Sequence, residues 1–247
     1  MHHPTILVVN CNTSDEVTRA IDASAQAVAA PGTRVRTVAP EWGVSSAEGY
    51  LDSFWSAASV LDLLASWQEP IDAVVMAGFG EHGREGAREL LAVPVVDITD
   101  ASVHLALSIA PKYGIVTSLD RTIHQIEASL ATGGVLAACA GIRATGIPVL
   151  DLESSPETID AIVANSRVLL EQGAEAIILG CAGLSGRADS IAEQIGAPVI
   201  DPVRAGVGVA DALIRLGLTT SKSLTYSPLA KSRPSWPGSA ASVTTTS

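Results

Sequence analysis

Short apolar runs that alternate with longer stretches of helical character constrain the fold of this chain more than any other feature. Most of the runs are continuous in Val and Ile, which is typical of strands buried on both faces of a parallel sheet. The stretches between them are rich in Ala, Glu and Arg. This alternation predicts an α/β fold with right-handed crossovers. The predicted strands cover residues 5–10, 34–40, 72–78, 93–98, 113–118, 147–152, 175–180 and 197–202.

The chain also contains an internal repeat. Residues 72–80 align without a gap with residues 175–183, and "VPVVD" (93–97) corresponds to "APVID" (197–201). Farther upstream, "ILVVNCN" corresponds to "YGIVTSL". The repeat predicts two similar doubly wound parallel-sheet domains, related by a pseudo-twofold axis, with the active site in the cleft between them.

The repeat also sets the expected domain boundaries. Residues 1–98 form the first domain and residues 99–204 the second. A last helix, near residues 204–217, is expected to cross back, so that residues 205–228 return to the first domain. Residues 229–247 are rich in Ser, Thr and Pro, which predicts a flexible tail.

Ligands of such sheets bind beyond the carboxyl ends of the strands. The repeat places these strand ends in pairs and predicts that they meet at one cleft. The residues concerned are Asn10, Cys11, Gly78, Thr117, Ser118 and Cys181.

Composition excludes several function classes. The formal net charge is −11, which argues against a nucleic-acid partner and against an anionic membrane surface. No apolar run reaches the length of a membrane span, and the first residues do not resemble a signal peptide. The 3 cysteines form neither a disulfide framework nor a metal motif. We therefore expect a cytoplasmic protein without a metal site.

Cys181 is the first candidate for chemistry. It stands at the end of a predicted strand with Gly180 before it and Gly183 two residues after it. A helix expected directly after Cys181 would lower the pKa of its thiol, so that it could act as a general acid or base. Cysteine is also a common small buried residue, but this position favours a functional role.

The loop after the first strand is the second candidate. Thr13 and Glu16 match a capping box, which predicts a helix that begins here. Asn10, Asn12, Thr13 and the helix amides are expected to hold a substrate oxygen, as are Thr117 and Ser118. Cys11 is either a second thiol facing the cleft or, as we favour, a small side chain without a role.

The glycine-rich turns form the third candidate. Backbone amides around Gly78, Phe79 and Gly80, and around Ala182 and Gly183, suit the stabilisation of an oxyanion. His82 could carry a proton, but a surface residue at a helix start is the simpler interpretation. His104 and His124 are expected at helix surfaces or in the interior, and Cys139 in packing.

Several segments together resemble the aspartate/glutamate racemase superfamily, and within it the hydantoin racemase branch, up to about Lys222. They are "VVNCNTS", "SSAEGYLD", "GFGEHG", "PVVDITDASVH", "IVTSLDRT", "ILGCAG", "PVIDP" and "LGLTTSK". The resemblance implies a pseudo-symmetric two-domain fold, a homo-oligomer and proton transfer without a cofactor. Two cysteines would flank a carbon next to a carbonyl, one removing its proton and the other returning a proton to the opposite face.

The chain departs from that pattern at three places. Cys181 matches the second cysteine of the family, but the first falls on Gly78. The family usually has Asp-Pro in place of Glu81 and His82, and Pro in place of Cys11. A glycine first and a cysteine second resembles arylmalonate decarboxylases at those two positions.

The leading hypothesis is a cofactor-independent racemase or isomerase of the hydantoin racemase type. It would transfer a proton through an enolate on a small substrate with a carbonyl or carboxylate, with Cys181 as acid/base. Cys11, Glu81 or His82 could replace the missing thiol, and Gly78→Cys is expected to restore a thiol pair. The alternatives are a one-thiol decarboxylase and a catalytically silent small-molecule binding protein.

Overall fold

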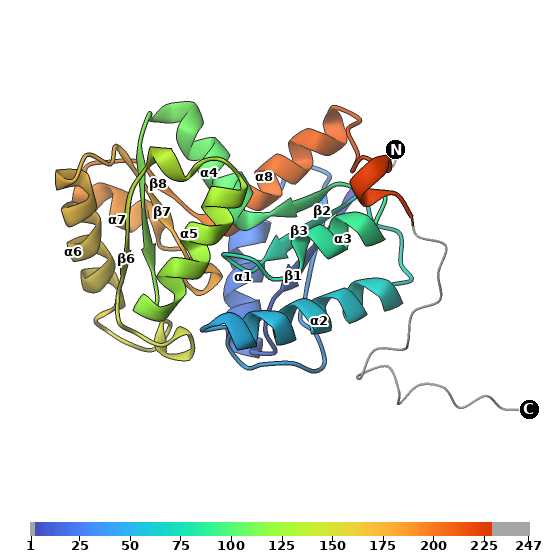
Figure 1. Ribbon diagram of the computed structural model, residues 1–247, viewed down its shortest axis with the longest axis horizontal. Coiled ribbons are helices and arrows are strands. Elements are labelled where there is room, and N and C mark those ends of the chain that lie inside the picture. Colours follow the sequence, from blue (N-terminus) through green and yellow to red (C-terminus); the bar gives the residue numbers. More distant parts are fainter. Residues whose placement is uncertain (1–2, 229–247) are drawn as a thin grey trace, which may run out of the picture.

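The computed structural model describes residues 3–228 and contains two parallel four-stranded sheets (Figure 1). In the first sheet the strand order is β2-β1-β3-β4, and every neighbouring pair is parallel. Its elements are β1 (Thr5–Asn10), α1 (Asp15–Val28), β2 (Arg34–Val38), α2 (Tyr50–Ser66), β3 (Ala73–Ala77), α3 (Arg84–Leu90) and β4 (Val95–Asp97).

The second sheet has the equivalent order β6-β5-β7-β8, also parallel throughout. The identical strand order of the two sheets agrees with the predicted duplication, and the predicted fold class is confirmed. The elements are α4 (Ile98–Ile109), β5 (Tyr113–Thr117), α5 (Ile123–Thr132), β6 (Cys139–Ala144), α6 (Thr158–Glu171), β7 (Ala176–Leu179), α7 (Ala188–Ile195), β8 (Val199–Ile200) and α8 (Pro202–Arg215).

One predicted strand is wrong. Residues 147–152 are a loop with a 3₁₀ turn at Val149–Asp151, and the strand at that place in the repeat is β6. Pro148 has no N–H to donate to a ladder, and the Val149 amide donates instead to Glu48. The β6 sequence "CAGIRA" was not recognised because an edge strand is only partly buried and lacks a continuous Val/Ile run. Cys139 opens this strand, is partly buried against the core cluster that contains Tyr113 and Ile115, and does not line the pocket described below. Its thiol donates to the Gly141 carbonyl at 3.4 Å.

Alternate residues of the inner strands pack on opposite faces of each sheet. In the first sheet, Ile6 and Val8 contact α1 and α8, whereas Leu7 and Val9 contact α2 and α3. In the second, Val116 packs toward α6 and α7, and Ile115 toward α4 and α5. Helices thus cover both faces of both sheets, which explains the uninterrupted apolar character of the strands.

Helix α8 follows the second sheet in sequence but packs on the first, as Figure 1 shows. Its Val203, Val207 and Ala210 are buried in the same core cluster as β1 and β3. The assignment of residues 1–98 and 99–204 to separate domains stays a prediction, and residues 229–247 lie outside the described part of the chain.

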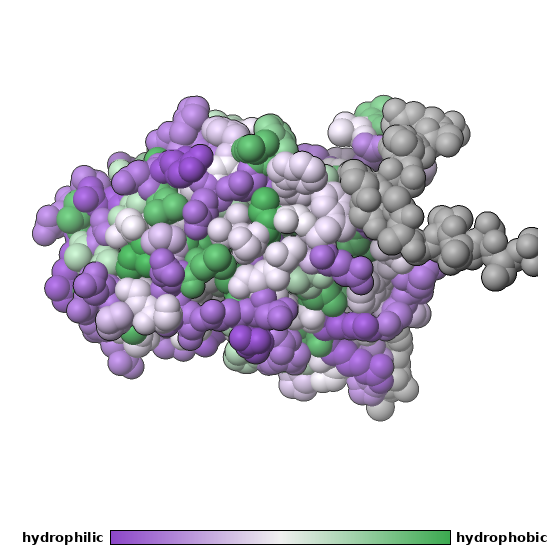
Figure 2. All heavy atoms as spheres, turned by 90° about the horizontal axis from the view of Figure 1, so that it is seen from below, coloured by the Kyte–Doolittle hydropathy of each residue, from purple (hydrophilic) through white to green (hydrophobic). Residues whose placement is uncertain are grey.

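Among residues 3–228, no helix is long and apolar enough to cross a membrane. The face seen in Figure 2 is a mosaic in which hydrophilic residues surround separate apolar patches. His104 and His124 are exposed on their helices, in agreement with the surface interpretation.

Candidate active site

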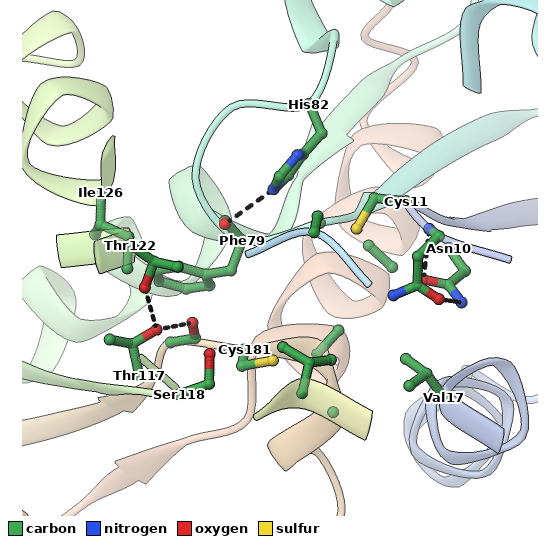
Figure 3. A pocket seen from close by; sticks show the side chains of 18 residues that line it. Asn10, Cys11, Val17, Phe79, His82, Thr117, Ser118, Thr122, Ile126 and Cys181 are labelled. Carbon is green, nitrogen blue, oxygen red and sulfur yellow. Dashed lines mark hydrogen bonds between the residues drawn. The ribbon is translucent and has the colours of Figure 1, made fainter. Parts of the chain in front are cut away.

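A pocket of about 40 Å³ lies where the carboxyl ends of the two sheets meet (Figure 3). It is lined by residues at the ends of β1, β3, β5 and β7. These four strand ends therefore meet at one place, as the sequence predicted. Of the predicted site residues, those that line the pocket are Asn10, Cys11, Asn12, Gly78, Phe79, His82, Thr117, Ser118, Cys181, Ala182 and Gly183.

Two predicted site residues lie outside the lining. The Thr13 hydroxyl donates a hydrogen bond to the Val44 carbonyl at 3.3 Å. The Gly80 amide donates to the Thr99 hydroxyl at 2.8 Å and is therefore not available to a substrate oxyanion. The partner of Thr13 lies in the loop before α2 and the partner of Gly80 lies in the first turn of α4, and no local sequence pattern predicts either contact.

Several further residues line the pocket without a signal in the sequence, and most of them are apolar. Ala47 lies in "SSAEGYLD", but an alanine carries no chemical signal, and Val149 was assigned to a strand that does not exist. Val17 on helix α1 and Thr122 and Ile126 at α5 have the spacing of ordinary core residues. Ala77 ends β3 and Gly180 follows β7, and neither has a side chain that signals chemistry. These further residues are Val17, Ala47, Ala77, Thr122, Ile126, Val149 and Gly180.

The loop after β1 holds its own shape through its two asparagines. The Asn10 side-chain nitrogen donates to the side-chain oxygen of Asn12 at 2.9 Å and to the Thr18 hydroxyl at 3.0 Å. The side-chain oxygen of Asn10 accepts a hydrogen bond from the backbone N–H of Asn12. Asn10 is thus fully engaged, whereas no protein group among the described residues accepts from the side-chain nitrogen of Asn12.

The capping box predicted at Thr13 is displaced by one residue. Helix α1 begins at Asp15, and the Ser14 hydroxyl accepts a hydrogen bond from the Val17 amide at 3.3 Å. The Thr13 hydroxyl does not form the predicted cap because it is hydrogen-bonded to the Val44 carbonyl instead.

The two polar residues at the end of β5 differ in availability. The Thr117 hydroxyl donates to the Gly180 carbonyl at 3.1 Å, which ties β5 to the turn before Cys181. The Ser118 hydroxyl lines the pocket and bonds to no other described residue. Ser118 can therefore donate to a bound molecule without losing an internal contact.

Cys181 does not have the environment that the sequence predicted. A single 3₁₀ turn at Ala182–Leu184 follows it, and α7 begins only at Ala188. The backbone amides of Gly183 and Leu184 lower its pKa, but burial raises it more and Glu48 adds to the increase. The thiol pKa is raised to about 11, so the predicted stabilisation of the thiolate is outweighed by desolvation.

Cys11 is buried and faces the same pocket. Burial raises the pKa of its thiol to about 12, and the electrostatic effect of Cys181 is the second cause. The two sulfurs are therefore close enough to influence each other. In Figure 3 they enter the pocket from opposite sides, one from the first sheet and one from the second. As at Cys181, desolvation outweighs the backbone hydrogen bond that lowers the pKa of the Cys11 thiol.

His82 is not at the surface, which corrects the simpler sequence interpretation. Its side chain is 5% exposed, and its Nε2 lies 3.2 Å from the Phe79 carbonyl oxygen. Because a carbonyl only accepts, Nε2 carries the proton. Burial lowers the pKa to about 4, so the ring is neutral near pH 7. Helix α3 is capped instead by Glu81, whose carboxylate accepts from the Gly83 and Arg84 amides.

Gly78 faces a space that other side chains have filled. A Cβ atom built at this position would lie 2.5 Å from His82 Cδ2, 2.7 Å from Cys11 Cβ and 3.0 Å from Cys11 Sγ. Any side chain there forces these neighbours to move. The expectation that Gly78→Cys simply restores a thiol pair is therefore not supported by the packing.

Within residues 3–228, no three His, Cys, Asp or Glu side chains gather in a way that could hold a metal ion. The arrangement can do acid/base chemistry with thiols. Hydrogen-bond donors for a substrate oxygen are available from Asn12, Ser118 and the Phe79 amide, for which no protein acceptor is found among the described residues.

Comparison with known proteins gives consistent matches. The family model Asp/Glu/Hydantoin racemase matches residues 6–210. A hydantoin racemase from Pseudomonas sp. (strain NS671) is 38% identical over 224 residues, 90% of each chain. The crystal structure of allantoin racemase from Pseudomonas fluorescens is 44% identical, with a TM-score of 0.91 over 93% of this chain and 99% of that one. A crystal structure of arylmalonate decarboxylase, 19% identical with a TM-score of 0.60 over 94% and 97%, shares the fold alone.

Proposed function

The chain belongs to the hydantoin racemase branch of the Asp/Glu/hydantoin racemase family, and on that premise we propose that it racemises a small cyclic ureide. The substrate class is a five-membered hydantoin ring with one substituent on the carbon next to the carbonyl, and allantoin is one member. Support comes from the 38% identity to a hydantoin racemase and the 44% identity to an allantoin racemase, each over 90% or more of both chains. The small pocket favours a compact substituent.

The observation that carries the proposal is the position of Cys181. The thiol stands at the carboxyl end of β7, inside a pocket that also holds unengaged donors from Asn12 and Ser118. A planar ring bound there would place its carbonyl oxygen against these donors and its acidic C–H against the sulfur. This is the arrangement that proton abstraction next to a carbonyl requires.

In the proposed reaction, the Cys181 thiolate removes the proton from one face of the ring carbon. The electron pair of the broken C–H bond moves onto the carbonyl oxygen, and the resulting enolate is stabilised by Asn12, Ser118 and the Phe79 amide. The Gly183 and Leu184 amides stabilise the thiolate while it exists. A proton that arrives from the opposite face then gives the other enantiomer.

The test uses the separate enantiomers of allantoin and of a 5-alkylhydantoin in deuterated buffer. Polarimetry reports inversion and proton NMR reports exchange, each after subtraction of the rate without enzyme. We expect loss of optical rotation and incorporation of deuterium to proceed together for at least one of the substrates. Exchange and inversion at the buffer rate for both substrates would contradict the proposal.

Two alternatives are outcomes of the same assay. Release of CO₂ from an arylmalonate would favour the one-thiol decarboxylase that the pair Gly78 and Cys181 resembles. A measurable affinity for the hydantoins without exchange would favour a binding protein. We expect arylmalonates to remain unchanged, because the likeness to the arylmalonate decarboxylase structure, at 19% identity, extends to the fold alone.

We propose further that the protein works as a homo-oligomer, as its resemblance to the family implies. Large apolar side chains on one helix support this, since Leu51 and Phe54 of α2 are 70% and 69% exposed. Light scattering of the purified protein is expected to give a multiple of the chain mass of 25.3 kDa. A monomer mass at assay concentration would exclude the assembly.

We also propose that the enzyme acts in the cytoplasm, where reducing conditions keep thiols free. Cys11, Cys139 and Cys181 are all free cysteines, and two of them line the pocket. Fractionation of the native cells should recover the racemase activity with cytoplasmic markers, and recovery from the medium would contradict this location.

A further inference from the structure

Racemisation through a planar enolate needs a proton donor or acceptor on each face of the reacting carbon. This inference rests on the function proposed above. Cys181 serves one face. The internal repeat pairs Cys181 with Gly78, which has no side chain, so the group for the second face must come from elsewhere in the pocket.

Cys11 lies where a side chain at position 78 would be. The Cβ position at Gly78 is 2.7 Å from Cys11 Cβ and 3.0 Å from Cys11 Sγ. Residue 77, just before Gly78, is paired in register with Asn10, just before Cys11, so β1 and β3 end side by side. A thiol carried by β1 thereby reaches the space that β3 leaves empty, and it enters the pocket from the first sheet, opposite Cys181 (Figure 3).

The other titratable groups near the pocket are engaged elsewhere. Glu81 caps α3, and its second oxygen pairs with Arg84 at 3.0 Å. Glu48 accepts a hydrogen bond from the Val149 amide at 2.9 Å. Asp97 caps α4 through the Thr99 amide at 2.8 Å.

His82 is the remaining candidate, and its bonding disfavours it. The Nε2 proton is donated to the Phe79 carbonyl, and the Cδ2 edge of the ring faces the Cβ position at Gly78. Nδ1 has no hydrogen-bond partner among the described residues and lies on the opposite edge of the ring, away from Gly78. Carbon offers no proton for transfer. His82 therefore packs against the thiol rather than taking its place.

We propose that Cys11 is the second acid/base of this enzyme, opposite Cys181. In one direction the Cys181 thiolate takes the proton and the C–H electron pair moves onto the carbonyl oxygen. The Cys11 thiol then gives its proton to the opposite face as the electron pair returns to carbon. Cys181 is left as thiol and Cys11 as thiolate, which is the state that racemises the other enantiomer.

The test separates the two faces. Wild type, Cys11→Ala, Cys11→Ser and Cys181→Ala are incubated with each enantiomer of the best hydantoin substrate in deuterated buffer. We expect both Cys11 variants to lose racemisation by about 100-fold or more. They should still exchange the C–H of one enantiomer without inversion, through Cys181. Cys181→Ala should show the mirror pattern and exchange only the other enantiomer.

Cys139→Ala is the matched control, because this free cysteine opens β6 and does not line the pocket. We expect it to keep wild-type rates. Thermal melting of each variant shows whether it is folded, and Cys11→Ser preserves the side-chain volume if Cys11→Ala does not fold.

Two outcomes would overturn the assignment of Cys11. One is racemisation by Cys11→Ser at a rate close to wild type. The other is an equal loss of exchange for both enantiomers in a folded Cys11 variant, which would indicate a structural role. If wild type itself neither exchanges nor inverts any cyclic ureide, the proposed function fails first and this assignment fails with it.

Discussion

At the scale of single residues, desolvation dominates the chemistry of the pocket. Burial raises the thiol pKa to about 12 at Cys11 and to about 11 at Cys181. The backbone amides of Gly183 and Leu184 lower the pKa of Cys181 but do not compensate for burial. Near pH 7 both groups are therefore thiols, and proton abstraction requires a small fraction of thiolate.

This state predicts the pH dependence of the rate. The thiolate fraction of a group well below its pKa grows about tenfold per pH unit, so kcat/KM should rise with this slope between about pH 6 and pH 8. Glu48 and Arg187 face Cys181, and Asp97 faces Cys11; Glu48 and Asp97 raise the thiol pKa values and Arg187 lowers that of Cys181. The measurement is initial-rate polarimetry with the buffer rate subtracted at each pH.

A flat profile over the same interval would mean that the protonated thiol is the active form. That result is the one expected of a one-thiol decarboxylase, which needs only an acid. A maximum near pH 7 would contradict the raised pKa values themselves.

At the scale of elements, the two halves repeat a strand that ends in Asp and is followed directly by a helix. Asp97 ends β4 and accepts from the Thr99 and Asp100 amides, and Asp201 precedes α8 and accepts from the Val203 and Arg204 amides. The repeat seen in "VPVVD" and "APVID" is therefore a repeated helix cap. Asp201 has a further task, because its second oxygen accepts from Ser24 of α1 and from the Gly186 amide.

Asp201→Ala should lower the free energy of unfolding by about 2 kcal/mol or more, since a lost cap costs about 1 kcal/mol and the buried partners also lose their acceptor. The measurement is urea denaturation followed by circular dichroism. Asp189→Ala is the control, because Asp189 is 78% exposed in its pair with Arg204 and should cost less than about 1 kcal/mol. Equal effects of the two substitutions would show that Asp201 does not connect α8 to its neighbours.

At the scale of the whole molecule, α8 connects the second half of the chain to the core of the first. Its approach is close because Gly206 lacks a side chain. A Cβ at Gly206 would lie 2.7 Å from Val75 Cγ1 on β3 and 3.0 Å from Ile98 Cγ2 on α4. The same helix carries Gly208, where a Cβ would meet nothing within 4 Å.

The two glycines give a matched pair of substitutions. Gly208→Ala should raise the free energy of unfolding by about 0.5–1 kcal/mol, which is the gain in helix propensity. Gly206→Ala gains the same helix propensity but should lower the free energy of unfolding by about 1–2 kcal/mol, because overpacking costs about 1–3 kcal/mol. Urea denaturation of both variants is the measurement, and stabilisation by Gly206→Ala would show that α8 can move away from β3 at little cost.

The sequence by itself determined the features that depend on local pattern. Val/Ile runs between helical stretches predicted two parallel sheets, because strands covered on both faces must be apolar throughout. The internal repeat placed Cys11, Gly78, Ser118 and Cys181 at strand ends, and parallel strands bring their carboxyl ends to one edge. The same reliance on apolar runs gave the wrong prediction for residues 147–152. An apolar run that contains Pro148 resembles a strand as long as its hydrogen-bond partners are not known.

Tertiary structure alone decided the chemistry of the pocket. The sequence contains a glycine at position 78 and a cysteine at position 11, and only the pairing of β1 with β3 brings the thiol into the space beside the glycine. The burial of His82 and the raised thiol pKa values depend equally on groups distant in the chain. Desolvation and close packing depend on all the residues that surround a group in space. Many of these residues are distant in the chain, so a local sequence pattern cannot reveal either effect.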